Sequence, residues 1–180
     1  NSPGVALLWV CRPDGHFHIR HEVKFNSSLV DRMAIKDVAA LLKQTVKRLG
    51  LSKVPPCFFD ADLYKFKGQT AESSVETFAR HGIPTGAKPD SKRVQGWQRV
   101  REMLRVAPDG VPWLTVDPSC LYLTRTLPML PQAKLNPEDV QDGGEDHAAD
   151  ALRFGAVSRT SWMPAAQPRP AVQPYSIAWW

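Results

Sequence analysis

Residues 4–25, GVALLWVCRPDGHFHIRHEVKF, combine two runs of β-forming residues with a Pro-Asp-Gly turn between them. Val, Ile, Phe and Trp favour extended backbone, and a short turn of this composition joins antiparallel neighbours. The stretch therefore predicts a β-hairpin at the start of the chain. A hairpin alone buries too little apolar surface to be stable, so the rest of the chain must cover it.

Helix-like and strand-like segments follow the hairpin. Apolar residues recur at helical spacing over residues 29–49, and Gly50 offers a left-handed cap. Further helices are predicted at 71–81, 91–106, 119–127 (ended by Pro128) and within 144–155, and short strands at 57–59 and 111–118. This order is typical of an α/β domain in which helices pack on a sheet.

Composition limits the classes to which the chain belongs. Its 180 residues suit one domain, which we assign to residues 1–159, followed by a Pro-rich tail at 160–180. Three cysteines without a CxxC pair indicate neither a disulfide framework nor a zinc knuckle. The sequence has no long apolar run and no signal-peptide pattern, so we expect a soluble chain that is not secreted. The net charge of +5 is compatible with an anionic partner.

Acidic residues gather in and before the segment GEDHAADALRFG, residues 144–155. Residues 138–150 hold six acids and no Lys or Arg, and such charges repel unless they are solvated or bridged by a cation. For Asp146 alone, capping of the helix start is a sufficient explanation. However, Asp146 and Asp150 are four residues apart, and His147 and Asp150 three apart, so each pair shares a helix face. With Asp60, at the end of the predicted strand 57–59, they are candidate ligands of Mg²⁺ or Mn²⁺.

Four blocks of sequence, in order, resemble the nuclease domain of the large terminase subunit of tailed bacteriophages. They are FFDADLYKFKGQTAESSVETFARHGI, DSKRVQGWQRVREML, RTLPML and GEDHAADALRFG, within residues 58–155. The resemblance implies an RNase H-like α/β fold, a mixed sheet with an antiparallel hairpin and helices on both faces. It also implies an endonuclease that uses two Mg²⁺ or Mn²⁺ ions to cut concatemeric double-stranded DNA, with little sequence preference, during viral packaging.

The resemblance also implies roles for particular residues. Asp60 would bridge or flank both ions, Asp146 and His147 would hold the second ion, and Asp150 would accompany them as a direct or indirect ligand. His147 has the alternative role of positioning a water molecule. A first metal-binding Asp is implied on a strand before Ser2, and a packaging ATPase domain is implied ahead of this one in the same polypeptide. The chain itself has no GxxxxGK[ST] loop, so we expect it not to hydrolyse ATP.

The basic residues predict where DNA would bind. Residues 80–105 contain seven Lys or Arg against two acids, a concentration suited to neutralising phosphates. The candidate DNA-binding residues are Lys88, Lys92, Arg93 and Arg99. A solvated helix face is an equally good explanation for Arg99.

Partners and location are implied by the same resemblance. The implied partners are the portal protein, to which the aromatic tail 160–180 would dock, and the small terminase subunit. The implied location is the host cell cytoplasm, with no membrane involved. Two alternatives stay open. One is a DNA-binding or portal-docking module of this fold that does not cut, and the other is a resolvase-like nuclease.

Overall fold

The computed structural model describes residues 3–26, 33–66, 72–89, 92–141 and 144–158. The predicted tail at 160–180 lies outside these residues. In chain order the elements are β1 (Pro3–Cys11), β2 (Phe17–Asn26), α1 (Ile35–Arg48), the 3₁₀ helix η1 (Ala61–Tyr64), α2 (Ser74–Arg80), α3 (Arg93–Met103), β3 (Leu114–Val116), α4 (Leu121–Thr126), the 3₁₀ helix η2 (Leu127–Met129) and α5 (His147–Val157).

The predicted hairpin is confirmed and forms most of the sheet. β1 and β2 are antiparallel, with a register irregularity after Leu8, and β3 adds to β2 in the parallel direction. Gly15 has φ 89°, a left-handed conformation that the turn requires and that glycine adopts without strain. The sheet is therefore mixed, in the order β1-β2-β3.

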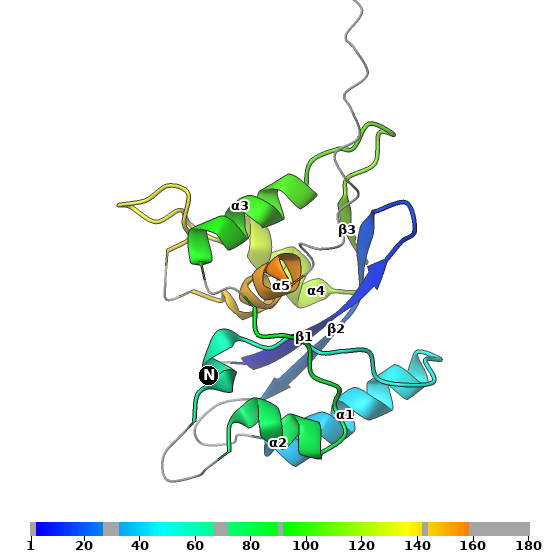
Figure 1. Ribbon diagram of the computed structural model, residues 1–180. Coiled ribbons are helices and arrows are strands. Elements are labelled where there is room, and N and C mark those ends of the chain that lie inside the picture. Colours follow the sequence, from blue (N-terminus) through cyan, green and yellow to red (C-terminus); the bar gives the residue numbers. More distant parts are fainter. Residues whose placement is uncertain (1–2, 27–32, 67–71, 90–91, 142–143, 159–180) are drawn as a thin grey trace, which may run out of the picture.

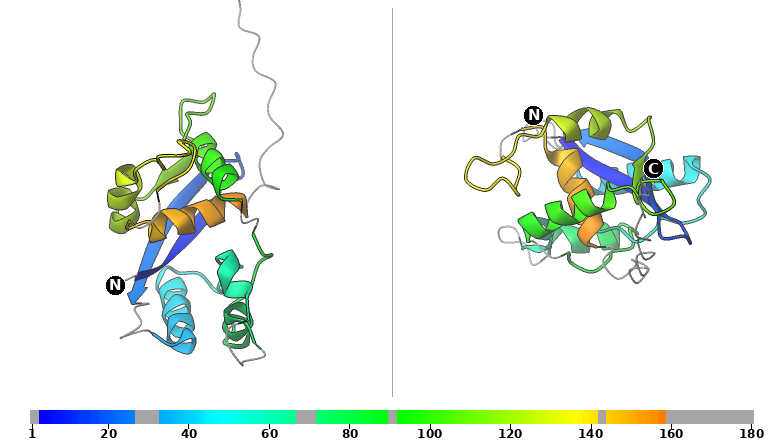
Figure 2. Two further views of the ribbon diagram at one scale, coloured as in Figure 1. Left: turned by 90° about the vertical axis from the view of Figure 1, so that its left-hand side faces the viewer. Right: turned by 90° about the horizontal axis from the view of Figure 1, so that it is seen from above.

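Helices cover the two faces of this sheet. α3, α4 and α5 lie on one face, and α1 and α2 lie on the other (Figures 1 and 2). The larger core is built on the face of α3–α5, where Ala148, Leu152 and Ala156 of α5 are completely buried. A second core joins Val38 and Ala39 of α1 to Phe78 and Ile83. The predicted α/β class, with a mixed sheet between two helical layers, is confirmed.

The predicted strand at 57–59 is wrong. Cys57 makes one isolated parallel bridge to Thr85, in which its N–H donates to Pro84 O and its carbonyl accepts from Gly86 N, both at 2.7 Å. Two prolines stand immediately before Cys57 and have no N–H to donate, which shortens the possible ladder. The segment therefore runs extended beside the sheet without forming a strand.

Several helix boundaries also differ from the predictions. α1 begins at Ile35 and not at residue 29, although residues 27–32 are not among those described. α4 starts at Leu121 and ends at Thr126, shortly before Pro128 as predicted, and Pro128 lies in the 3₁₀ turn η2, which tolerates proline near its start. α2 begins at Ser74, where Ser73 and Glu76 form a capping box that fixes the start of the helix.

Candidate active site

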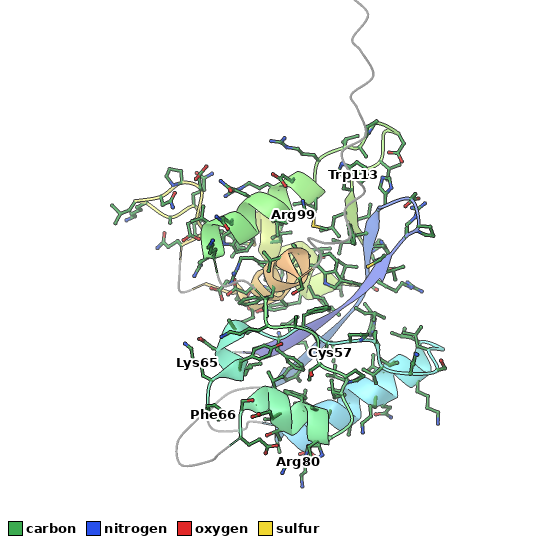
Figure 3. All side chains as sticks on the ribbon, in the orientation of Figure 1. Cys57, Lys65, Phe66, Arg80, Arg99 and Trp113 are labelled. Carbon is green, nitrogen blue, oxygen red and sulfur yellow. The ribbon has the colours of Figure 1, made fainter. Side chains whose placement is uncertain are left out.

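A cavity of about 560 Å³ lies beside β1 and between the two helical layers. Within the described residues β1 pairs with β2 alone, so its second edge faces this cavity. Residues 4–9 of β1 line one wall and residues 54–60 the opposite wall, while α1 and α5 contribute the remaining sides. Cys57 belongs to the second wall and lies between β1 and the layer of α1 and α2 (Figure 3). Burial raises the pKa of its thiol to about 11, so the thiol stays neutral.

Asp60 lies at one end of this cavity, where the extended segment turns into η1. One oxygen of its carboxylate accepts the backbone N–H of Asp62 at 2.9 Å, which caps η1. Asp62 also lines the cavity and forms an ion pair with Lys65 at 2.6 Å. The hydrogen bond between the two side chains of this pair raises the pKa of the Lys65 ammonium group. Asp60 therefore has a local structural role and an exposed carboxylate at the cavity.

Three polar residues stand at the start of α5, Asp146, His147 and Asp150. His147 and Asp150 line the cavity, as does Asp60. Asp146 is the N-cap residue, but its side chain makes no capping hydrogen bond, so the capping explanation for this residue is wrong. Asp146 is not among the lining residues, and its Oδ1 lies 3.8 Å from the His147 Nδ1.

Arginines from outside the acidic run neutralise part of it. Arg93 of α3 pairs with Asp139 at 3.0 Å, and Arg125 of α4 pairs with Glu145 at 2.8 Å. Arg153, on the same helix, pairs with Asp150 at 3.0 Å. Like charges that repel in an isolated segment are thus bridged by cations from α3, α4 and α5.

Carboxylates and an imidazole are suitable ligands for a hard divalent cation, so the donor chemistry of this cavity fits the implied metal. The described residues supply these donors around one cavity but bring no three of them close enough to hold an ion. Asp60, from the start of η1, and His147 and Asp150, from α5, line the same cavity. The donor set thus fits in kind and is incomplete in number within the described part of the chain.

Two of the candidate DNA-binding residues have partners inside the protein. Arg93 donates to Asp139 and to the carbonyl of Val140, which attaches the segment before α5 to α3. Arg99, which Figure 3 shows on α3, pairs with Glu102 one turn away at 3.3 Å. Lys88 and Lys92 are exposed. These two lysines are therefore more exposed than Arg93 and Arg99, which are partly buried.

Sequence reasoning missed His21 and Arg153. His21 of β2 lines the cavity, and Arg153 is almost completely buried against α3. The spacing of Asp150 and Arg153, three residues apart on a helix, was a signal for their ion pair. No local signal distinguished a buried arginine from a solvated one.

An RNase H-like α/β domain with acids around a cavity at the sheet edge is the class defined by these features. Solved structures of two phage proteins share the fold. One is the large terminase from a thermophilic bacteriophage, with a TM-score of 0.63, 14% identity, and coverage of 86% of this chain and 36% of that chain. The other is the P22 large terminase nuclease domain, with a TM-score of 0.65, 13% identity, and coverage of 91% of this chain and 77% of that chain. This chain therefore has the fold of the large-terminase nuclease domain, as the sequence blocks implied.

Other comparisons add no family assignment. No protein-family model matches the chain, and no curated protein is similar to it in sequence. The chain spans about a third of the length of the thermophilic phage's large terminase. Among the described helices, none has the length and apolar character needed to cross a membrane.

Proposed function

We propose that this chain is the nuclease domain of a viral DNA-packaging terminase and that it hydrolyses phosphodiester bonds of double-stranded DNA with the help of divalent cations. The observation that carries the proposal is the position of Asp60, His147 and Asp150 around one cavity at the edge of the sheet. The fold shared with the two phage proteins supports it. Little sequence preference is expected, because contact with the DNA backbone does not read bases.

The residues of the cavity divide the work of hydrolysis. Two Mg²⁺ or Mn²⁺ ions, when bound, supply an activated water and neutralise charge on the leaving oxygen. Asp60 would hold both ions, and Asp146 with His147 would hold the second. Because His147 lines the cavity and Asp146 does not, His147 has the more direct access to a phosphate bound there. Its imidazole also suits the alternative task of orienting a water molecule.

The cavity at the second edge of β1 has room for a further strand, which would supply the missing metal ligand. An extended strand placed there would pair with the second edge of β1 on one side and approach Cys57 and Phe59 on the other. Its length would match residues 4–9, about 20 Å at the usual rise per residue. The sequence resemblance implies a first metal-binding Asp on a strand before Ser2, and a carboxylate on a strand in this place would add to the donors of Asp60, His147 and Asp150.

The proposed partners follow from the same function. Double-stranded DNA would contact Lys88 and Lys92, whose exposed ammonium groups can neutralise phosphates. The portal protein, the small terminase subunit and the ATPase domain of the same polypeptide would complete the packaging motor in the host cytoplasm. The tail 160–180 is the proposed portal-docking segment.

The test is plasmid cleavage by the full-length protein that contains this chain, with Mg²⁺ or Mn²⁺ and with chelator. Asp60→Asn removes the charge but keeps an oxygen that can still cap η1, so it should abolish cleavage without unfolding the domain. Asp62→Asn is the matched control, because it removes a charge two residues away and keeps the backbone N–H that Asp60 accepts. We expect this control to cut at a near-normal rate.

The outcomes separate the proposal from its alternatives. Full activity in excess chelator would contradict metal-dependent hydrolysis. Normal cutting by Asp60→Asn together with loss of cutting in Asp62→Asn would transfer the ligand role to Asp62. DNA binding without any cleavage at millimolar Mn²⁺ would instead favour the non-cleaving module.

A further inference from the structure

Arg153 is a buried cation next to the candidate site. Its side chain is 6% exposed, and its Nε donates to Asp150 Oδ1 at 3.0 Å. The guanidinium also stacks over the ring of Phe154, 4.2 Å from its centroid, and lies 5.9 Å from the centroid of Trp97. Arginine remains protonated in proteins, so this burial requires a nearby counter-charge. Asp150 supplies that charge.

The helix α3 is shaped to accept this side chain. Gly96 is buried where α3 meets α5, and a Cβ built on it would lie 2.7 Å from Cγ and 3.0 Å from Cδ of Arg153. These atoms are in the middle of the arginine side chain, which is held at its far end by Asp150, so they have little freedom to move away. The glycine thus creates the space in which Arg153 meets Asp150.

The ion pair restricts the orientation of Asp150. A carboxylate without a fixed partner rotates about its side-chain bonds, whereas a short charge-assisted hydrogen bond fixes one oxygen. Asp150 also lines the cavity that holds Asp60 and His147. With one oxygen held by Arg153, the other is left for the cavity.

We infer that Arg153 is a positioning residue that holds Asp150 in the orientation in which one carboxylate oxygen serves the metal-dependent site. The inference rests on the proposed function and assigns a role to a residue that contacts neither DNA nor ion. Residues that orient metal ligands from behind are typically worth about 10-fold to 100-fold in metal affinity. Gly96 contributes to this positioning, because the absence of a Cβ leaves room for the Arg153 side chain to reach Asp150.

The test measures Mn²⁺ binding by calorimetry, without DNA, in the full-length protein. Arg153→Met keeps the length and apolar contacts of the side chain and should weaken Mn²⁺ binding by about 10-fold. Arg153→Lys, which keeps the charge, should restore most of this loss. In an Asp150→Asn background, Arg153→Met should change Mn²⁺ affinity no further, since the two residues act as one unit.

A second variant keeps both members of the ion pair. Gly96→Ala should weaken Mn²⁺ binding in the same direction by displacing Arg153, whereas Gln95→Ala, at an exposed neighbouring position of α3, should not. This comparison carries the test if Arg153→Met does not fold. Circular dichroism and urea unfolding of each variant identify loss of structure.

Three results would overturn the inference. One is normal Mn²⁺ affinity in both Arg153→Met and Gly96→Ala while the wild-type protein binds Mn²⁺ and cuts DNA. Another is an equal loss of affinity from Arg153→Met in the wild-type and Asp150→Asn backgrounds, which would mean that Arg153 acts through the fold in general. A wild-type protein that binds no Mn²⁺ would contradict the proposed function as well, which distinguishes the two failures.

Discussion

Gly155→Ala tests how α5, which carries His147 and Asp150, is seated on the sheet. A Cβ on Gly155 would lie 2.5 Å from two carbons of the Trp9 ring and 2.6 Å from its nitrogen. The ring has little room to retreat, because its edge meets Phe17 with a centroid distance of 6.1 Å, and Phe17 is completely buried. The added methyl group must therefore move α5 away from β1 or turn the indole.

The expected magnitude follows from two opposing effects. Normal carbon–carbon contacts begin near about 3.5 Å, so the ring or the helix must shift by about 1 Å. Overpacking of this kind costs about 1–3 kcal/mol, and replacing a helical glycine with alanine returns about 1 kcal/mol. Because three ring atoms are involved and not one flexible tip, we expect a net destabilisation of about 1–2 kcal/mol.

The assay is urea unfolding followed by far-ultraviolet circular dichroism, with a matched glycine substitution as control. Gly144 has no atom within 4 Å of a built Cβ, so Gly144→Ala should change the free energy of unfolding by less than about 0.5 kcal/mol. A Gly155→Ala protein as stable as the wild type, or stabilised by the helix propensity of alanine, would refute the close seating of α5 on Trp9.

Two further predictions concern side chains of β2 that contact α4 and the residue after β3. The carboxylate of Glu22 accepts the backbone N–H groups of Tyr122 at 2.6 Å and Leu123 at 2.9 Å. Glu22→Gln replaces one acceptor oxygen with a donor and should lower the free energy of unfolding in urea by about 1–3 kcal/mol. An unchanged urea midpoint would show that water caps α4 equally well. Hydrogen bonds from Ser119, followed by the interaction with Arg20, lower the pKa of the Asp117 carboxyl group from 3.8 to about 2. The contribution of this carboxylate to stability is therefore complete above pH 3.8 and is lost as the pH falls toward 2. The difference in stability between wild type and Asp117→Asn should therefore shrink across that acid range, and a difference that stays constant would contradict the assignment.

Local patterns were sufficient to predict the elements that depend on near neighbours. The hairpin was predicted from two β-rich runs and a turn, because cross-strand pairing across a short connection needs no distant residue. Gly50 was predicted as a left-handed cap and has φ 80°, a conformation that glycine adopts without strain. The acids and histidine of residues 145–150 were likewise correctly placed at the start of a helix. In each case the structure is selected by residues of one helix end or of two strands joined by a short turn.

The predicted strand at 57–59 was wrong because a strand depends on residues that are distant in the sequence. Apolar character indicates burial, but a strand also requires hydrogen-bonding neighbours that come from elsewhere in the chain. Cys57 finds one such neighbour at Thr85 and faces a cavity on the side of β1. The amino-acid pattern contains no information about that second side.

The electrostatics of the site were decided by tertiary packing. Residues 138–150 hold six acids and no Lys or Arg in the sequence. In the folded chain, however, Asp139 pairs with Arg93, 46 positions away, and Glu145 pairs with Arg125 of α4. The same packing places His147 and Asp150 at one cavity with Asp60. Residue types determine which donors are available, whereas the energy of a charge depends on its distance from other charges and on its burial, and both are properties of the folded chain.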